Sequence, residues 1–268
     1  MAPTDRTMQF CTDLVAGLAD GGVTVVVISP GSRNTPLTLA VAREPRLRDI
    51  NVRDERSAGF MAVGFGKATG TPAAVLCTSG SAATHYFPAV VEADQDSVPL
   101  IVLTADRPLR LRNTYAPQTM NQADLYGTHV KTFIDATDPS ADGRALGAQI
   151  AGEAIDAIAG AIHCNVPLDE PLVPEALPKV PEPHPLEPPV VEYSGPTDTL
   201  AGLVGHRVLI VASGHQANGF AEALDTTARA LGAPIIADPR TPVHGPNVIH
   251  HGDLLVSARQ ADTSVLDD

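Results

Sequence analysis

The sequence predicts an α/β fold built on a parallel sheet, because short apolar runs recur at even spacing and each is followed by a polar cluster. Residues 23–28, 72–76 and 100–103 are apolar throughout, which is typical of strands buried on both faces of a sheet. Their spacing of roughly 25 residues suits repeated strand–helix units. Since parallel strands point the same way, the clusters that follow them are expected along one carboxyl edge, where open α/β sheets bind ligands.

The intervening segments have helical patterns. In chain order the predicted helices are 36–43, 57–68, 82–94 and the Ala- and Ile-rich segment 148–162. Residues 167–196 are dense in proline, which stiffens the backbone and removes N–H donors, so a semi-rigid linker is expected there.

A second, smaller α/β unit is predicted after the linker. Strands at 206–212 and 233–237, a turn at 213–215 and a helix at 219–231 form one βαβ unit. One such unit exposes both sheet edges and buries little apolar surface, so we expect further protein beyond residue 268.

Composition favours a cytoplasmic protein that binds a small molecule. The 268 residues include 18 Lys and Arg against 31 Asp and Glu, and the net charge of −13 disfavours nonspecific binding to nucleic acid or anionic membranes. Cys11, Cys77 and Cys164 are widely separated and odd in number, which indicates reduced thiols. Neither a secretion signal nor a segment for membrane insertion is predicted.

One of the polar clusters, at 53–56, carries a candidate acid. Glu55 lies at a predicted strand-to-helix junction, where desolvation would raise the pKa of its carboxyl and let it share a proton with a bound base. The alternative is that Asp54 and Glu55 simply cap the following helix. Position alone favours neither interpretation.

Two other clusters offer cations for an anionic ligand. Ser32 and Arg33 follow a Pro30–Gly31 turn at a helix start, an arrangement suited to a carboxylate or phosphate. Arg107 offers a second cation. Each arginine alone is more often a solvated surface residue, but two on one edge favour an anionic substrate.

Hydroxyls and a glycine at 78–81 allow close approach of a ligand, yet neither the P-loop nor the dinucleotide-binding pattern is present. The sequence therefore argues against nucleotide triphosphates and nicotinamide cofactors as the ligand. His244, His250 and His251 lack the spacing of a zinc site, so no metal ligands are predicted.

Taken together, four motifs resemble one family of enzymes. ISPGSRNTPL at 28–37, DERSAGF at 54–60, TADRP at 104–108 and APQTM at 116–120 are similar to the 2-succinyl-5-enolpyruvyl-6-hydroxy-3-cyclohexene-1-carboxylate synthases of menaquinone biosynthesis. These are thiamine-diphosphate enzymes of the transferase class. After residue 165 only the architecture matches. The chain departs from the family at His85, where relatives usually carry asparagine, and at Tyr115, where they usually carry glycine.

The resemblance implies a domain plan. Residues 1–177 correspond to the parallel-sheet pyrimidine-binding (PYR) domain, 178–200 to a proline-rich linker and 201–268 to an incomplete central α/β domain. In the family, a third domain binds the diphosphate through Mg²⁺ or Mn²⁺, using a Gly-Asp-Gly motif and an asparagine. Gly252-Asp253-Leu254 does not match that motif, so the diphosphate-binding domain is expected to be absent from this chain.

The resemblance also implies roles for individual residues. The glutamate matching Glu55 hydrogen-bonds N1′ of the cofactor's aminopyrimidine, and Gln118 reaches the reacting centre as a second catalytic residue. Pro30, Thr78 and Gly80 line the cofactor's pyrimidine side. Ser32, Arg33 and Arg107 hold carboxylates of the two anionic substrates, 2-oxoglutarate and isochorismate.

Three hypotheses remain open at this point. The first is the N-terminal portion of such a synthase, inactive alone and expected to form a homo-oligomer. The second is a split enzyme whose PYR subunit pairs with a separate diphosphate-binding chain. The third is a noncatalytic scaffold that keeps the fold.

Overall fold

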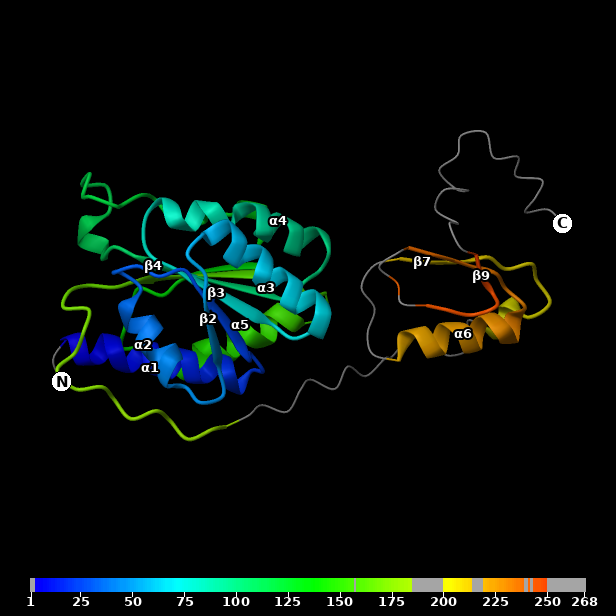
Figure 1. Ribbon diagram of the computed structural model, residues 1–268, viewed down its shortest axis with the longest axis horizontal. Coiled ribbons are helices and arrows are strands. Elements are labelled where there is room, and N and C mark those ends of the chain that lie inside the picture. The colour runs from blue at the N-terminus through cyan, green and yellow to red at the C-terminus, as the bar shows by residue number, and fades with distance from the viewer. Residues whose placement is uncertain are drawn as a thin grey trace. The chain divides into compact units, whose positions relative to one another are not determined.

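The computed structural model describes residues 3–156, 158–184, 200–213, 219–238, 241 and 243–249. The chain divides into two compact units, Met1–Val191 and Glu192–Asp268. The predicted α/β class is confirmed in both, since each unit contains a parallel sheet accompanied by helices (Figure 1).

The larger unit has a six-stranded sheet in the order β2-β1-β3-β4-β6-β5, with every neighbouring pair parallel. Its strands are β1 (Val25–Ile28), β2 (Arg48–Asn51), β3 (Ala73–Cys77), β4 (Leu100–Asp106), β5 (Thr132–Asp135) and β6 (Ala161–Pro167). β1, β3 and β4 are buried along their whole length, which explains why their sequences are apolar without alternation. The edge strands β2 and β5 are short and partly polar; the sequence implied a strand before Glu55 without giving its bounds, and it did not predict β5.

Helices cover both faces of this sheet (Figure 1). One face carries α1 (Pro3–Asp20), α2 (Thr35–Arg43) and α5 (Gly143–Ile155); the other carries α3 (Glu55–Thr69) and α4 (Phe87–Gln95). Two hydrophobic cores result. Leu14, Leu37 and Ile150 belong to the first core, and Ala62 and Val90 belong to the second.

Two helix predictions are wrong in their extent. The segment 148–162 is helical only to Ile155, and Ala161–Pro167 is strand β6. The first two residues of the strand, Ala161 and Ile162, continue the Ala- and Ile-rich composition of the helix, so composition could not place the boundary. The segment 82–94 is divided into a 3₁₀ turn, Ser81–Tyr86, and helix α4, which has proline in its first turn. Helix α1 was not predicted.

The smaller unit confirms the predicted βαβ arrangement. Its three parallel strands are β7 (Ile210–Ala212), β8 (Ile235–Ala237) and β9 (Val248–Ile249), and α6 (Phe220–Leu231) follows β7. The small core includes Ala212, Leu224, Ala228, Ile235 and Val243. Several features singled out in the sequence lie outside the described residues: 214–215 of the predicted turn, His250, His251 and the segment 252–254.

The described part of the predicted linker, 168–184, is bound to the larger unit. Arg43 Nη1 donates to Pro178 O at 2.8 Å. The backbone N–H of His184 donates to Asp20 Oδ1 at 3.0 Å, and Asp20 itself is buried. This segment is therefore a strap on the surface of the first unit, with its backbone held by charged side chains.

Among the described residues, no helix combines the length and the apolar character needed to cross a bilayer.

Candidate active site

The four polar clusters lie along one edge of the larger sheet. They follow β1, β2, β3 and β4, and these strands are adjacent and parallel in the order β2-β1-β3-β4. The carboxyl ends of the strands therefore bring residues 30–33, 53–56, 78–81 and 107–108 to a common rim, as the sequence predicted.

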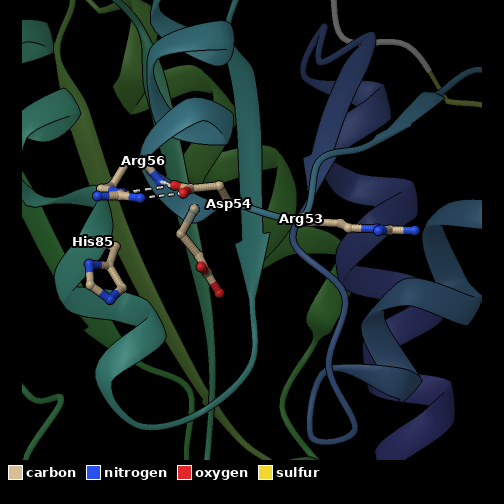
Figure 2. Close-up of a pocket in the computed structure, with 5 residues that line it drawn as sticks. Arg53, Asp54, Arg56 and His85 are labelled. Carbon is tan, nitrogen blue, oxygen red and sulfur yellow. Dashed lines mark hydrogen bonds and ion pairs between the residues drawn. The ribbon is translucent and has the colours of Figure 1, made fainter.

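Asp54 is the N-cap of α3. Its Oδ1 accepts a hydrogen bond from Arg56 N at 2.9 Å, and its carboxylate pairs with the Arg56 guanidinium (Figure 2). The hydrogen bonds from Arg56 hold the pKa of Asp54 well below its usual value. The capping interpretation is thus correct for Asp54, and it leaves the neighbouring Glu55 available for another task.

Glu55 is the first residue of α3 and lines a cavity of about 470 Å³ together with Arg53, Asp54, Arg56 and His85. Its carboxylate accepts no hydrogen bond from the residues that the structure describes. Figure 2 shows His85 on the side of the Asp54–Arg56 pair, whereas Arg53 is directed away from it. The cavity is therefore rimmed by charged and titratable groups.

The helix–sheet interface covers Glu55 only in part. Glu55 is partly exposed, because its position in the first turn of α3 places it at the cavity and not beneath the helix.

The loop after β1 packs tightly against the loop after β3. A Cβ atom on Gly31 would lie 2.4 Å from Thr78 Cβ, a distance that real Cβ atoms do not reach. Arg33 N donates to Thr78 Oγ1 at 3.3 Å. Pro30 and Ser32 are exposed on this rim. Glycine at position 31 therefore allows the two candidate ligand-binding loops to touch.

The two candidate substrate arginines differ in burial. Arg33 is only 5% exposed, and its Nη1 donates to Leu168 O at 3.0 Å. Its Nη2 pairs with Glu170 Oε1 at 3.0 Å. Arg107 is partly exposed. The Nε atoms of both arginines are buried and have no hydrogen-bond partner among the described residues.

Gln118 lies over the loop after β3. Its Nε2 donates to Ser79 O at 3.1 Å, and Ser79 Oγ donates to Gln118 O at 3.1 Å. Gly80 has a φ of 87°, and a Cβ there would lie 3.0 Å from Gln118 Cγ. The structure thus brings Gln118 to Gly80. The cavities around Glu55 and Ser32 share no lining residue, and neither includes Gln118 or Arg107.

Gln122 is a buried residue that the sequence did not single out. Its Oε1 accepts from Gly80 N at 2.7 Å, and its Nε2 donates to Ala105 O at 3.2 Å and to Asn165 Oδ1 at 3.0 Å. One amide therefore joins the ends of β3, β4 and β6. The only available signal was its place four residues after Gln118, which does not indicate burial.

A partly buried ion cluster lies beside Gln122. Arg112 binds Asp135 at 2.6 Å and Asp106 at 2.9 Å, and Asn165 Nδ2 donates to both carboxylates. Burial raises the pKa of Asp135, but the hydrogen bonds from Arg112 and Asn165 outweigh it and hold that pKa below its usual value. The cluster fixes the start of the loop that carries Gln118.

His163 lies within the sheet behind this cluster. It is fully buried, and its Nε2 is 2.8 Å from Thr104 Oγ1. Burial lowers the pKa of His163 to about 4. Its ring meets the ring of Tyr126 edge-on, with centroids 4.7 Å apart. His163 is therefore a neutral core residue at pH 7.

In the part of the chain that the structure describes, no group of three or more His, Cys, Asp or Glu side chains is placed to hold a metal ion.

Comparison with known proteins gives one family match. Residues 8–125 match the thiamine pyrophosphate enzyme, N-terminal TPP binding domain. The match covers Glu55, Ser32, Arg33, Thr78, Gly80, Arg107 and Gln118.

Individual relatives extend the similarity over most of the chain. A 2-succinyl-5-enolpyruvyl-6-hydroxy-3-cyclohexene-1-carboxylate synthase of Geobacillus kaustophilus (strain HTA426) is 43% identical over 256 residues, which are 88% of this chain and 44% of the relative. The protein of that name from Chloroflexus aurantiacus (strain ATCC 29366 / DSM 635 / J-10-fl) is 42% identical over 262 residues, covering 92% and 44%. One from Listeria innocua serovar 6a (strain ATCC BAA-680 / CLIP 11262) is 49% identical over 176 residues, covering 62% and 30%. The chain spans less than half the length of these curated relatives.

Proposed function

We propose that this chain supplies the pyrimidine-binding side of a 2-succinyl-5-enolpyruvyl-6-hydroxy-3-cyclohexene-1-carboxylate synthase, because residues 8–125 match the N-terminal TPP binding domain of thiamine pyrophosphate enzymes. The proposed reaction decarboxylates 2-oxoglutarate and adds the resulting succinyl unit to isochorismate, a step of menaquinone biosynthesis. The observation that carries the proposal is Glu55, a carboxylate with no hydrogen-bond donor among the described residues, on a cavity at the carboxyl edge of a parallel sheet.

The residues at this edge fit the proposed cofactor. The cavity of about 470 Å³ lies within the usual size range of small-molecule sites. When bound, thiamine diphosphate supplies the nucleophilic carbon and the electron sink that decarboxylation needs. Glu55 would hold a proton at N1′ of the aminopyrimidine. Pro30, Thr78 and Gly80 would line its ring, with Gly80 reached where Gln118 now lies over it.

The candidate substrate residues lie on the same rim. Ser32, Arg33 and Arg107 would bind substrate carboxylates, and the unpaired Nε atoms of both arginines support this role. Gln118 would orient a reacting group from its position above Gly80. Both proposed substrates are anions, which suits a rim that presents two guanidinium groups.

A complete site requires a further partner in this proposal. The diphosphate and a Mg²⁺ or Mn²⁺ ion would be bound by protein outside these residues, either in a homo-oligomer of a longer chain or in a separate diphosphate-binding chain. Residues 1–177 would act as the PYR domain, 178–200 as the linker and 201–268 as part of the central domain. The three cysteines are free and buried, which suits the cytoplasm, where we place the enzyme.

The test is release of carbon dioxide from 2-oxoglutarate in the presence of isochorismate, thiamine diphosphate and Mg²⁺. We expect no turnover by the chain alone and turnover after a separately expressed diphosphate-binding domain is added. Glu55→Gln should abolish that activity, whereas Glu175→Gln, at an exposed position away from the cavity, should leave it unchanged. Activity that survives Glu55→Gln contradicts the assigned role of Glu55, and inactivity of every mixture favours the scaffold hypothesis.

A further inference from the structure

Arg33 is an incompletely satisfied cation in a buried position. Only 5% of its surface is exposed to solvent. Its Nη1 is held by Leu168 O, and its Nη2 by Glu170 Oε1. The Nε–H has no acceptor among the described residues. A buried guanidinium with a free donor favours a further anionic partner, because an unpaired polar group away from water is unfavourable.

The two acceptors that Arg33 does have differ in kind. Leu168 O is a backbone carbonyl at a buried position just after β6, and β6 holds that position in the sheet. Glu170 contributes a flexible carboxylate that is 70% exposed. The contact to Leu168 can therefore persist while the Glu170 side chain turns into solvent.

Glu170 also lines a cavity beside Arg33. This cavity, of about 650 Å³, is bounded by Ser32, Glu170, Pro171, Leu172 and Val173. Its lining combines one hydroxyl and one carboxylate with three apolar side chains. Such a cavity suits a ligand that has a carboxylate at one end and an apolar or cyclic body.

We propose that Glu170 occupies the place on Arg33 that a substrate carboxylate takes, so that Glu170 is an internal competitor which the substrate must displace. This inference rests on the proposed role of Arg33 in substrate binding. A ligand without a carboxylate in that position cannot replace Glu170 and gains nothing from Arg33. Glu170 is therefore a residue that determines specificity and does not touch the reacting atoms.

Asp169 provides a matched control. It is the adjacent residue and is also exposed; its carboxylate pairs with Arg110 at 2.7 Å and accepts the Glu170 backbone N–H at 2.8 Å, an acceptor that the asparagine oxygen keeps, and it makes no hydrogen bond to Arg33. Asp169→Asn removes the same charge as Glu170→Gln, one residue away. The two variants separate release of Arg33 from a general loss of negative charge near the cavity.

The experiment follows the Arg33 Nε–Hε resonance in ¹⁵N spectra of the full chain, assigned with Arg33→Lys. Isochorismate is titrated into wild type, Glu170→Gln and Asp169→Asn, with sodium chloride of equal ionic strength as reference. We expect the apparent dissociation constant to fall at least about two- to fivefold in Glu170→Gln, the factor of an ordinary surface ion pair, because the Glu170 side of this pair is exposed. Asp169→Asn should differ from wild type by less than that factor.

The alternative outcomes point to different errors. Equal affinity in wild type and Glu170→Gln, with the Arg33 signal moving in both, overturns the competition and leaves Arg33 as a substrate residue. Weaker binding in Glu170→Gln means that Glu170 positions Arg33, which also overturns it. If the Arg33 signal moves in no variant, Arg33 is not part of the proposed substrate site, and the proposed competition by Glu170 is wrong as well.

Discussion

Acidification should destabilise the larger unit through His163, a residue outside the candidate site. The imidazole is fully buried in β6, between Thr104 and the rings of Tyr126 and Phe133. Burial lowers the pKa of His163 from 6.5 to about 4. As the pH falls, the unfolded chain therefore binds a proton at this imidazole near pH 6.5, whereas the folded protein binds it only near pH 4.

The sign and the size of the effect follow from that difference. Between pH 6.5 and pH 4 the unfolded state binds more protons, so the free energy of unfolding falls as the pH falls through this interval. The interval of 6.5 − 4, about 2.5 pH units, corresponds to about 3 kcal/mol at 1.36 kcal/mol per unit. Below pH 4 both states hold the proton, and the contribution of His163 levels off.

The assay is urea unfolding at pH 7, 5.5 and 4, followed by tyrosine fluorescence, because the chain contains no tryptophan. His163→Gln should be less stable than wild type at pH 7 but should lose about 3 kcal/mol less between pH 7 and pH 4. Equal losses in wild type and His163→Gln would refute the reasoning.

Three substitutions test the packing of the rim by urea unfolding. Gly31→Ala should cost about 1–3 kcal/mol, because the new Cβ would meet Thr78 at 2.4 Å, and Thr78→Gly in the same chain should restore part of the loss. Gln122→Leu should cost about 1–3 kcal/mol, because it leaves the Gly80 N–H and other buried polar groups without their partner. Arg112→Ala should cost about 3–5 kcal/mol, because it removes the cation from two carboxylates, one of them fully buried.

Exposed neighbours provide the controls for the last two substitutions. Gln118→Leu should cost less than about 1 kcal/mol, since that side chain is exposed. Arg110→Ala removes a solvent-exposed ion pair with Asp169 and should also cost less than about 1 kcal/mol. If a control variant lost as much free energy of unfolding as the substitution it is paired with, burial would not be the cause of these losses.

The sequence was sufficient for the features that depend on chain direction and burial. β1, β3 and β4 are uniformly apolar because both faces are covered, and a parallel sheet brings the residues that follow them to one edge. That is why Arg33, Thr78 and Arg107 could be assigned to a common rim. The start of β6, Ala161 and Ile162, has the same composition as the preceding helix, so the sequence predicts it as the end of that helix.

Contacts between distant residues could not be predicted in this way. Glu170 binds Arg33 across 137 positions of the chain, and Asn165 binds Asp106 across 59. No local pattern marks either partner, because the pairing depends on which strands become neighbours. The partial exposure of Glu55 was missed for a related reason: position at the start of a helix does not determine what covers it.

The strap over 168–184 affects how the first unit can be produced by itself. A gene cut at the predicted boundary, residue 177, would delete Pro178 and His184, which bind Arg43 and Asp20 in the full chain. The buried carboxylate of Asp20 would keep its ion pairs with two arginines but would lose the hydrogen bond from the His184 backbone N–H. The shortest fragment that retains every described contact of Asp20 therefore ends no earlier than His184.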